Sequence, residues 1–160
     1  MLEQGFNQLD YSQELGTGTG ATVHDYGCAE CSVTSECVNA GHATNPIQLN
    51  QDLIRVGAYA SNGATAYDEL IFSKLTSVYS DMKLAFNNFY PSDPCDMTVI
   101  DAQLAKGLGV IVGVDFNHNP SATSASHFVR IYKKNSDGSY QCFDSWAVNG
   151  IRISSGASCE

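Results

Sequence analysis

The stretch Tyr26-Gly27-Cys28-Ala29-Glu30-Cys31 places a cysteine behind a glycine, at the start of a predicted helix. Far downstream, Ser126-His127-Phe128-Val129 carries a histidine into a predicted strand, and Cys142-Phe143-Asp144-Ser145-Trp146 carries a carboxylate on the following strand. Thiol, imidazole and carboxylate are the three parts that acyl transfer to a cysteine needs. The sequence therefore predicts an enzyme.

The first half of the chain has the residue spacing of helices. From Cys28 to Ala40, apolar residues recur at helical intervals, and a glycine stops the segment. Asn45-Pro46 supplies a cap and a proline at the first position of a second helix. We expect a third helix over residues 66–75. A fourth is expected over residues 98–107, from an acidic variant of the capping box at Thr98 to a glycine stop.

The second half of the chain changes to the pattern of strands. Continuous apolar or alternating runs of strand length occupy residues 110–114, 127–132 and 140–144. Asn135-Ser136-Asp137-Gly138 is a turn sequence that joins the last two as a hairpin. Two isoleucines near the C-terminus, Ile151 and Ile153, add a short fourth strand.

This order of elements predicts an α+β fold with segregated layers. We expect an N-terminal helical layer, with Cys28 at a helix start, packed on a C-terminal antiparallel sheet. The chain has 160 residues, of which 43% are hydrophobic and 16% charged, and that is enough to bury one core. Residues 1–160 are therefore expected to form a single domain.

Charge and hydropathy exclude several kinds of partner. The formal net charge is −9, and the chain has only 8 Lys and Arg residues, which disfavours nucleic acid and anionic membranes. No stretch approaches the roughly 20 apolar residues of a membrane span, and the N-terminus lacks the basic and apolar parts of a secretory signal. We expect a soluble protein, made without a signal peptide. The oligomeric state stays open.

The expected fold gives each of the three groups a physical role. At a helix start, unpaired backbone N–H groups and the macrodipole favour a thiolate at Cys28 over a thiol. Packing of the helix on the sheet would bring His127 beside the sulfur. Asp144, on the neighbouring strand, would then hold the other ring nitrogen and fix its tautomer.

These residues resemble the papain-like cysteine peptidases related to the double-glycine leader peptidases of bacteriocin exporters, a group that includes bacterial and phage peptidases. The resemblance covers nearly the whole chain, in several patches that occur in the same order. They are Tyr11-Ser12-Gln13, Asp25-Tyr26-Gly27-Cys28, Thr34-Ser35, Asn45-Pro46, Leu49-Asn50, residues 100–107, Val110-Ile111-Val112, His127-Phe128-Val129 and Phe143-Asp144-Ser145-Trp146.

The resemblance implies a role for each site residue. Cys28 is the nucleophile, His127 the general base and acid, and Asp144 the residue that orients the imidazole. Gln13 is the side-chain donor of an oxyanion hole, which the backbone N–H of Cys28 completes. Two positions depart from the family pattern, because members commonly have proline where Gly109 and Ser145 stand here.

The implied activity is hydrolysis of peptide bonds through an acyl-enzyme on Cys28, without a cofactor or a metal ion. The expected partner is a peptide, foremost the peptides of bacterial cell-wall peptidoglycan, which a phage or bacterial lysin cuts after release to the wall. Processing of proteins or leader peptides is the alternative substrate class. A papain-like binding module with an idle Cys28 is the non-enzymatic alternative.

Cys31 creates two rival interpretations. Cys28-x-x-Cys31 at a helix start is the spacing of thiol–disulfide exchange, but the alternating βαβ order of such folds is missing. Zinc binding by Cys28, Cys31, Cys37 and His42 is disfavoured because Cys37 points away from Cys28 on a helix. Since Cys28 and Cys31 share a helical face, a reversible disulfide between them is a further hypothesis for redox control.

Asp115, Asn117 and Asn119 imitate the opening of a calcium-binding loop. A proline replaces the turn glycine and a serine replaces the bidentate acid, so a loop beside the cleft is the favoured interpretation. Six cysteines with uneven spacing indicate no disulfide framework, and most are expected to be free thiols. A bridge from Cys142 to Cys95 or Cys159 outside a cell stays open.

Overall fold

The structure, a computed structural model, describes residues 3–61, 67–83, 96–114, 127–146 and 151–154. Its helices, in chain order, are η1 (Gln8–Asp10), α1 (Val23–Tyr26), α2 (Cys28–Asn39), α3 (Pro46–Arg55), η2 (Phe72–Lys74), α4 (Leu75–Val78) and α5 (Met97–Leu104). Its strands are β1 (Tyr59–Ser61), β2 (Tyr67–Leu70), β3 (Val110–Val114), β4 (His127–Lys134), β5 (Tyr140–Asp144) and β6 (Ile151–Ser154).

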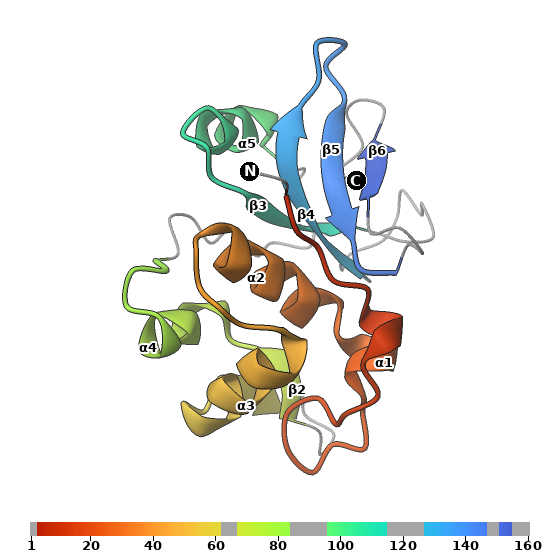
Figure 1. The fold of residues 1–160 in the computed structure, drawn as a ribbon, viewed down its shortest axis with the longest axis vertical. Helices are drawn as coiled ribbons and strands as arrows, with labels where there is room; N and C mark the ends of the chain where they lie inside the picture. The colour runs from red at the N-terminus through yellow and green to blue at the C-terminus, as the bar shows by residue number, and fades with distance from the viewer. Residues whose placement is uncertain (1–2, 62–66, 84–95, 115–126, 147–150, 155–160) are drawn as a thin grey trace.

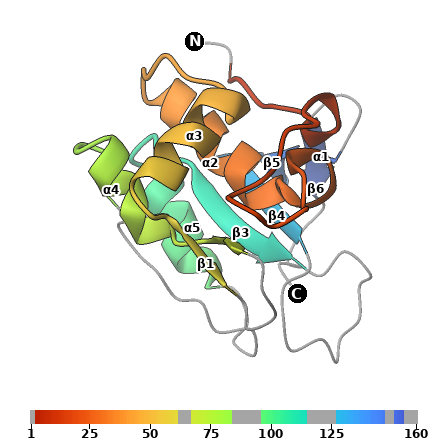
Figure 2. The same ribbon diagram turned by 90° about the horizontal axis from the view of Figure 1, so that it is seen from below.

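The helices and the main sheet form separate layers (Figure 1). The sheet has the strand order β3-β4-β5-β6, and every neighbouring pair is antiparallel. Helix α2 packs on β4, and Figure 2 shows α2 between the sheet and α3. Helix α5 lies beside β3 and β4, and β1 and β2 form a small hairpin of their own. The predicted α+β class is confirmed.

Local sequence explains where the two long helices begin. Asn45 caps α3, because its side-chain oxygen accepts a hydrogen bond from the Gln48 N–H at 3.0 Å, and Pro46 follows at the first helical position. Gly27 precedes α2 and offers no side-chain cap. The start of α2 therefore keeps backbone N–H groups that no capping side chain satisfies.

Two of the helix predictions are wrong in part. Instead of one helix over residues 66–75, the chain forms β2 and then two short helices, η2 and α4. Pairing with β1, which sets Tyr59 opposite Leu70, overrides the helical spacing of this segment. The fourth helix begins before Thr98, because the Asp96 carboxylate accepts hydrogen bonds from the Thr98 N–H at 2.9 Å and hydroxyl at 2.6 Å and so acts as the cap.

The hydrophobic core has one cluster in each layer. The buried residues of the helical cluster are Leu15, Val23, Cys31, Val33, Cys37, Leu49, Leu53, Ala58 and Tyr59. Those of the sheet cluster, which includes one residue of α5, are Ile100, Val112, Val129, Ile131, Tyr140 and Cys142. In the part of the chain that the structure describes, none of the helices is both long and apolar enough to cross a membrane.

A buried arginine joins the two layers. Arg130, on β4, has a side chain that is 3% exposed, and its Nε lies 2.5 Å from the Glu36 carboxylate on α2. The other oxygen of Glu36 accepts a hydrogen bond from the Gly109 N–H at 3.2 Å. A proline at position 109, which the resemblance leads one to expect, could not donate that bond.

We predict that Glu36→Ala lowers the free energy of unfolding by about 2 kcal/mol, because it removes a partner from a buried guanidinium that keeps Glu3 as its other partner. Arg55→Ala is the matched control, since that arginine is 71% exposed and pairs with Asp52 on the surface. Its change should stay within about 0.5 kcal/mol. Urea unfolding measures the free energy of unfolding of the two variants. Equal decreases would contradict a stabilising role for the Arg130–Glu36 pair.

Candidate active site

Three element ends meet at the predicted site. Cys28 is the first residue of α2, His127 is the first residue of β4, and Asp144 is the last residue of β5. Cys28 is half-buried, whereas His127 is 5% and Asp144 3% exposed. Cys28 is thus more accessible than its two predicted partners, which are shielded from water.

The register of the β4–β5 hairpin sets His127 against Asp144. Val129 pairs with Asp144, and His127 stands two residues before Val129 on the same face, so it is the diagonal neighbour of the carboxylate. The His127 Nε2 lies 2.8 Å from the Asp144 Oδ1. The same oxygen accepts a hydrogen bond from the Trp146 N–H at 2.9 Å, which holds the carboxylate in place.

Cys28 is the second partner of the imidazole. Burial lowers the pKa of His127, but hydrogen bonds with Asp144 and with the Cys28 thiol outweigh burial and raise this pKa from 6.5 to about 9. Because Asp144 occupies Nε2, we infer that the sulfur faces Nδ1. His127 thus lies between the Cys28 sulfur and the Asp144 carboxylate, and these two contacts favour its protonated form.

The junction between α1 and α2 leaves no room for a side chain before Cys28. The Gly27 N–H donates to the Val23 carbonyl at 2.8 Å, and the Gly27 carbonyl accepts from the Cys31 N–H at 2.8 Å. A Cβ on Gly27 would lie 2.5 Å from the Val23 carbonyl oxygen. Glycine is required here by close packing, which fixes the direction in which α2 starts.

Gln13 lies in the segment that leads to α1. Its backbone carbonyl accepts a hydrogen bond from the Val23 N–H at 3.0 Å, so Gln13 is tied to the first residue of that helix. Within the described residues, the side-chain Nε2 of Gln13 is buried and has no hydrogen-bond partner. Buried donors are rarely left unpaired, and this one has the property that an oxyanion donor needs.

Sequence reasoning missed the contribution of Gln8, which is 1% exposed. Its side chain bridges Ser145, next to Asp144, and the backbone of His24 in α1. A single glutamine near the start of a chain carries no periodic or motif signal, so only the folded structure identifies it.

The structure bears on thiol–disulfide exchange at Cys31 and on metal binding, the two rival interpretations of the cysteines. Cys31 is 1% exposed, and burial, Glu30 and Cys28 raise the pKa of its thiol well above the ordinary value, which disfavours thiolate exchange. Among the residues described, Cys28, Cys31 and Cys37 included, no group of three or more His, Cys, Asp or Glu residues could hold a metal ion. The calcium-loop residues 115–119, and the proposed cysteine partners Cys95 and Cys159, lie outside the described residues.

Cys28, His127 and Asp144 together form a chain of thiol, imidazole and carboxylate. The Gln13 backbone is hydrogen-bonded to Val23, the first residue of the helix that leads to Cys28. Such an array can attack a carbonyl carbon and then protonate the leaving group.

Comparison of the chain with models of protein families, with curated proteins and with solved structures finds no match.

We predict that stability falls with rising pH through the titration of His127. Folding raises the pKa of this group, so its contribution to stability is complete below about pH 6.5 and is lost as the pH approaches about 9. Urea unfolding at several pH values should show a steeper loss over this range for the wild type than for His127→Ala. If the free energy of unfolding fell equally with pH in both proteins, the stabilising contacts of protonated His127 would be contradicted.

We predict that Gly27→Ala slows alkylation of Cys28 by iodoacetamide about tenfold or more, because the new methyl group forces apart α1 and the start of α2. The free energy of unfolding should fall by about 1–3 kcal/mol. Adding Val23→Ala should not restore the rate, since the clash involves the Val23 backbone. An unchanged alkylation rate would show that the junction does not position the sulfur.

Proposed function

We propose that this protein is a cysteine peptidase of papain-like architecture that hydrolyses peptide bonds through an acyl-enzyme on Cys28. The observation that carries the proposal is the placement of His127 between the Cys28 thiol and the Asp144 carboxylate. A buried imidazole with these two partners is the arrangement that activates a thiol for nucleophilic attack.

The first half of the reaction forms the acyl-enzyme. The Cys28 sulfur, as a thiolate paired with the imidazolium of His127, attacks the carbonyl carbon of the peptide and gives a tetrahedral oxyanion. The backbone N–H of Cys28 and the Gln13 Nε2 would donate hydrogen bonds to that oxygen, and the unpartnered state of Nε2 supports this role. His127 then gives its proton to the leaving nitrogen, and the C–N bond breaks.

The second half releases the product. Neutral His127 takes a proton from water, whose oxygen attacks the thioester carbon. Collapse of the second tetrahedral species breaks the C–S bond and returns the thiolate, while the imidazole keeps its proton. Throughout, Asp144 holds the ring and stabilises the imidazolium, which is the role that its 2.8 Å contact supports.

We assign the substrate to the peptides of bacterial cell-wall peptidoglycan, on the strength of the resemblance to bacterial and phage peptidases. This assignment rests on analogy of sequence pattern. Processing of proteins or leader peptides is the competing substrate class. The two differ in their products, because a wall endopeptidase releases new amino termini from cross-linked walls.

The catalytic assignment is tested with Cys28→Ala and His127→Ala against peptides and purified bacterial cell walls. Each variant should lose about a thousandfold or more of the hydrolysis rate, while Cys31→Ala, which removes a buried thiol, should stay substantially active. Circular dichroism establishes that each variant is folded. Undiminished turnover by either of the first two would overturn the assignment.

Two further measurements separate the alternatives. Fast alkylation of Cys28 alone among the six cysteines, lost in His127→Ala, supports an enzyme, whereas slow and uniform labelling supports an idle binding module. Mass spectrometry of the amino termini released from walls supports the wall substrate. Cleavage of unfolded proteins or leader peptides with intact walls would favour processing instead.

A further inference from the structure

Gln8 makes hydrogen bonds to two segments that carry the site. Its Oε1 accepts from the Ser145 hydroxyl at 2.7 Å, and its Nε2 donates to the His24 carbonyl at 2.9 Å. Its backbone N–H also donates to the Ser145 carbonyl at 2.9 Å. Both polar ends of this buried amide are thereby used, each on a different element.

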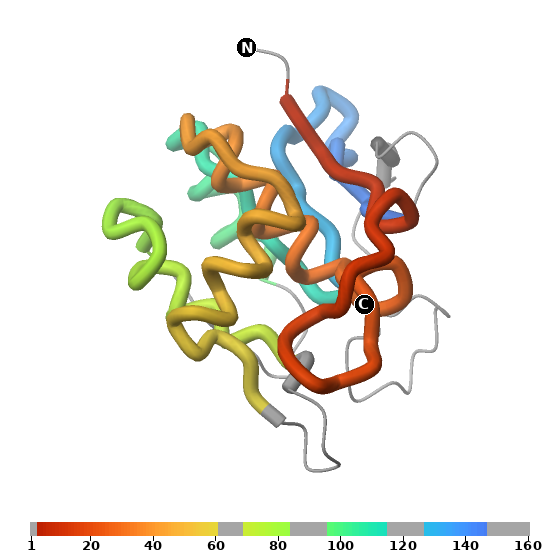
Figure 3. The backbone as a smooth tube through the Cα atoms, turned by 60° about the horizontal axis from the view of Figure 1, so that its bottom comes forward, coloured from red at the N-terminus to blue at the C-terminus, as the bar shows by residue number. Residues whose placement is uncertain are grey.

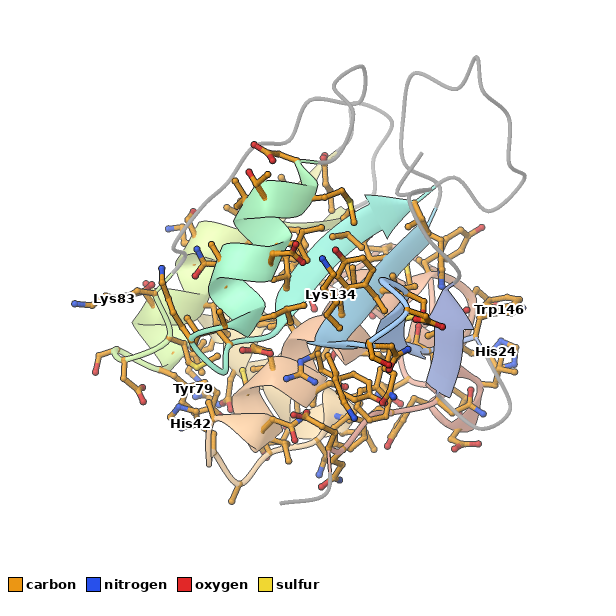
Figure 4. The ribbon with its side chains drawn as sticks, turned by 90° about the horizontal axis from the view of Figure 1, so that it is seen from above. His24, His42, Tyr79, Lys83, Lys134 and Trp146 are labelled. Carbon is orange, nitrogen blue, oxygen red and sulfur yellow. The ribbon has the colours of Figure 1, made fainter. Side chains whose placement is uncertain are left out.

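The two segments are the ones whose separation the chemistry must control. Ser145 follows Asp144 directly, and His24 lies in α1, which leads through Gly27 to Cys28. In Figure 4 the labelled side chains of His24 and Trp146, which flank the two segments joined by Gln8, lie on the same side of the molecule. Figure 3 traces the N-terminal segment, in red, to this region.

We propose that Gln8 is a positioning residue, which fixes the carboxylate turn at residues 144–146 against the helix that leads to the nucleophile. The inference rests on the proposed function, because it concerns the same reaction. Gln8 touches neither the sulfur nor the imidazole in any hydrogen bond of its own; it acts through Ser145 and His24.

The Gln8 bridge requires a hydrogen-bond donor in the side chain at position 145. Ser145 is 3% exposed, and its hydroxyl is used on Gln8. The proline that the resemblance leads one to expect at this position has no hydroxyl to donate. The serine and the glutamine therefore depend on one another, and loss of either leaves a buried polar atom without its partner.

Loss of the Gln8 hydrogen bonds should change the pKa of His127, whereas a general loss of stability should not. If the carboxylate turn moves relative to α1, the hydrogen bonds of His127 with Asp144 and Cys28 weaken together. The pKa of His127 then falls from about 9 toward its ordinary value of 6.5. The pH dependence of Cys28 alkylation and the NMR titration of the His127 ring both report this change, and neither requires a substrate.

The decisive variant is Gln8→Met, which keeps the size of the side chain but removes both side-chain hydrogen bonds. We expect kcat to fall about tenfold to a hundredfold with KM changed less than about twofold. The midpoint of His127 titration should fall by about one pH unit or more. Ser145→Ala should give a smaller shift in the same direction, and Ser145→Thr, which keeps the hydroxyl, should restore the wild-type midpoint.

Asn39→Ala is the matched control. Its amide also ties the N-terminal segment to a helix, because Nδ2 donates to the Gln4 carbonyl at 2.9 Å, but it does so at the C-terminal end of α2. This variant should lower the melting temperature without moving the His127 midpoint. An unmoved midpoint in folded Gln8→Met, or an equal shift in Asn39→Ala, would overturn the inference.

The outcomes separate this inference from the proposed function. If the wild type hydrolyses no peptide but the His127 midpoint moves in Gln8→Met, the positioning role stands and the peptidase proposal fails. If the wild type hydrolyses peptides and Gln8→Met leaves both kcat and the midpoint unchanged, only the positioning role fails.

Discussion

The register between β4 and β5 is the constraint on which the site depends. With Val129 opposite Asp144, the carboxylate and His127 lie on one face and within hydrogen-bonding distance. A slip of one residue would turn Asp144 to the other face of the sheet. The turn at residues 135–138 joins the two strands, and a register shift between Ile131 and Lys133 brings Val129 opposite Asp144. A sheet that is ordinary in its topology thus carries the geometry of the proposed reaction.

Two polar connections complement the packing of α2 on the sheet. Near one end, Arg130 on β4 pairs with Glu36 on α2. Near the other, Gln8 joins the end of β5 to α1. Neither α2 nor β4 could rotate far against the other without breaking one of them. Hydrogen bonds are directional and hydrophobic contacts are not, so these connections fix the relative orientation of the layers.

The sequence allowed some of these features to be predicted and concealed others. Helices α2 and α3 and strands β3, β4 and β5 have long, clear patterns, and the meeting of Cys28 with His127 and Asp144 follows from their order. The segment that forms β2 was misassigned, because its strand character comes from pairing with β1. The bridge by Gln8 depends on a contact across 137 positions, for which local pattern has no sign.

The distribution of the three groups along the chain affects when the thiol acquires its chemistry. A ribosome releases the helix that bears Cys28 long before the two strands that bear His127 and Asp144. Until those strands pair, the sulfur lacks its proton carrier, and it is an ordinary cysteine toward the nascent polypeptides around it. Pairing of β4 with β5 therefore completes the site only after both strands have been synthesised, and under the proposed function it would delay proteolysis until then.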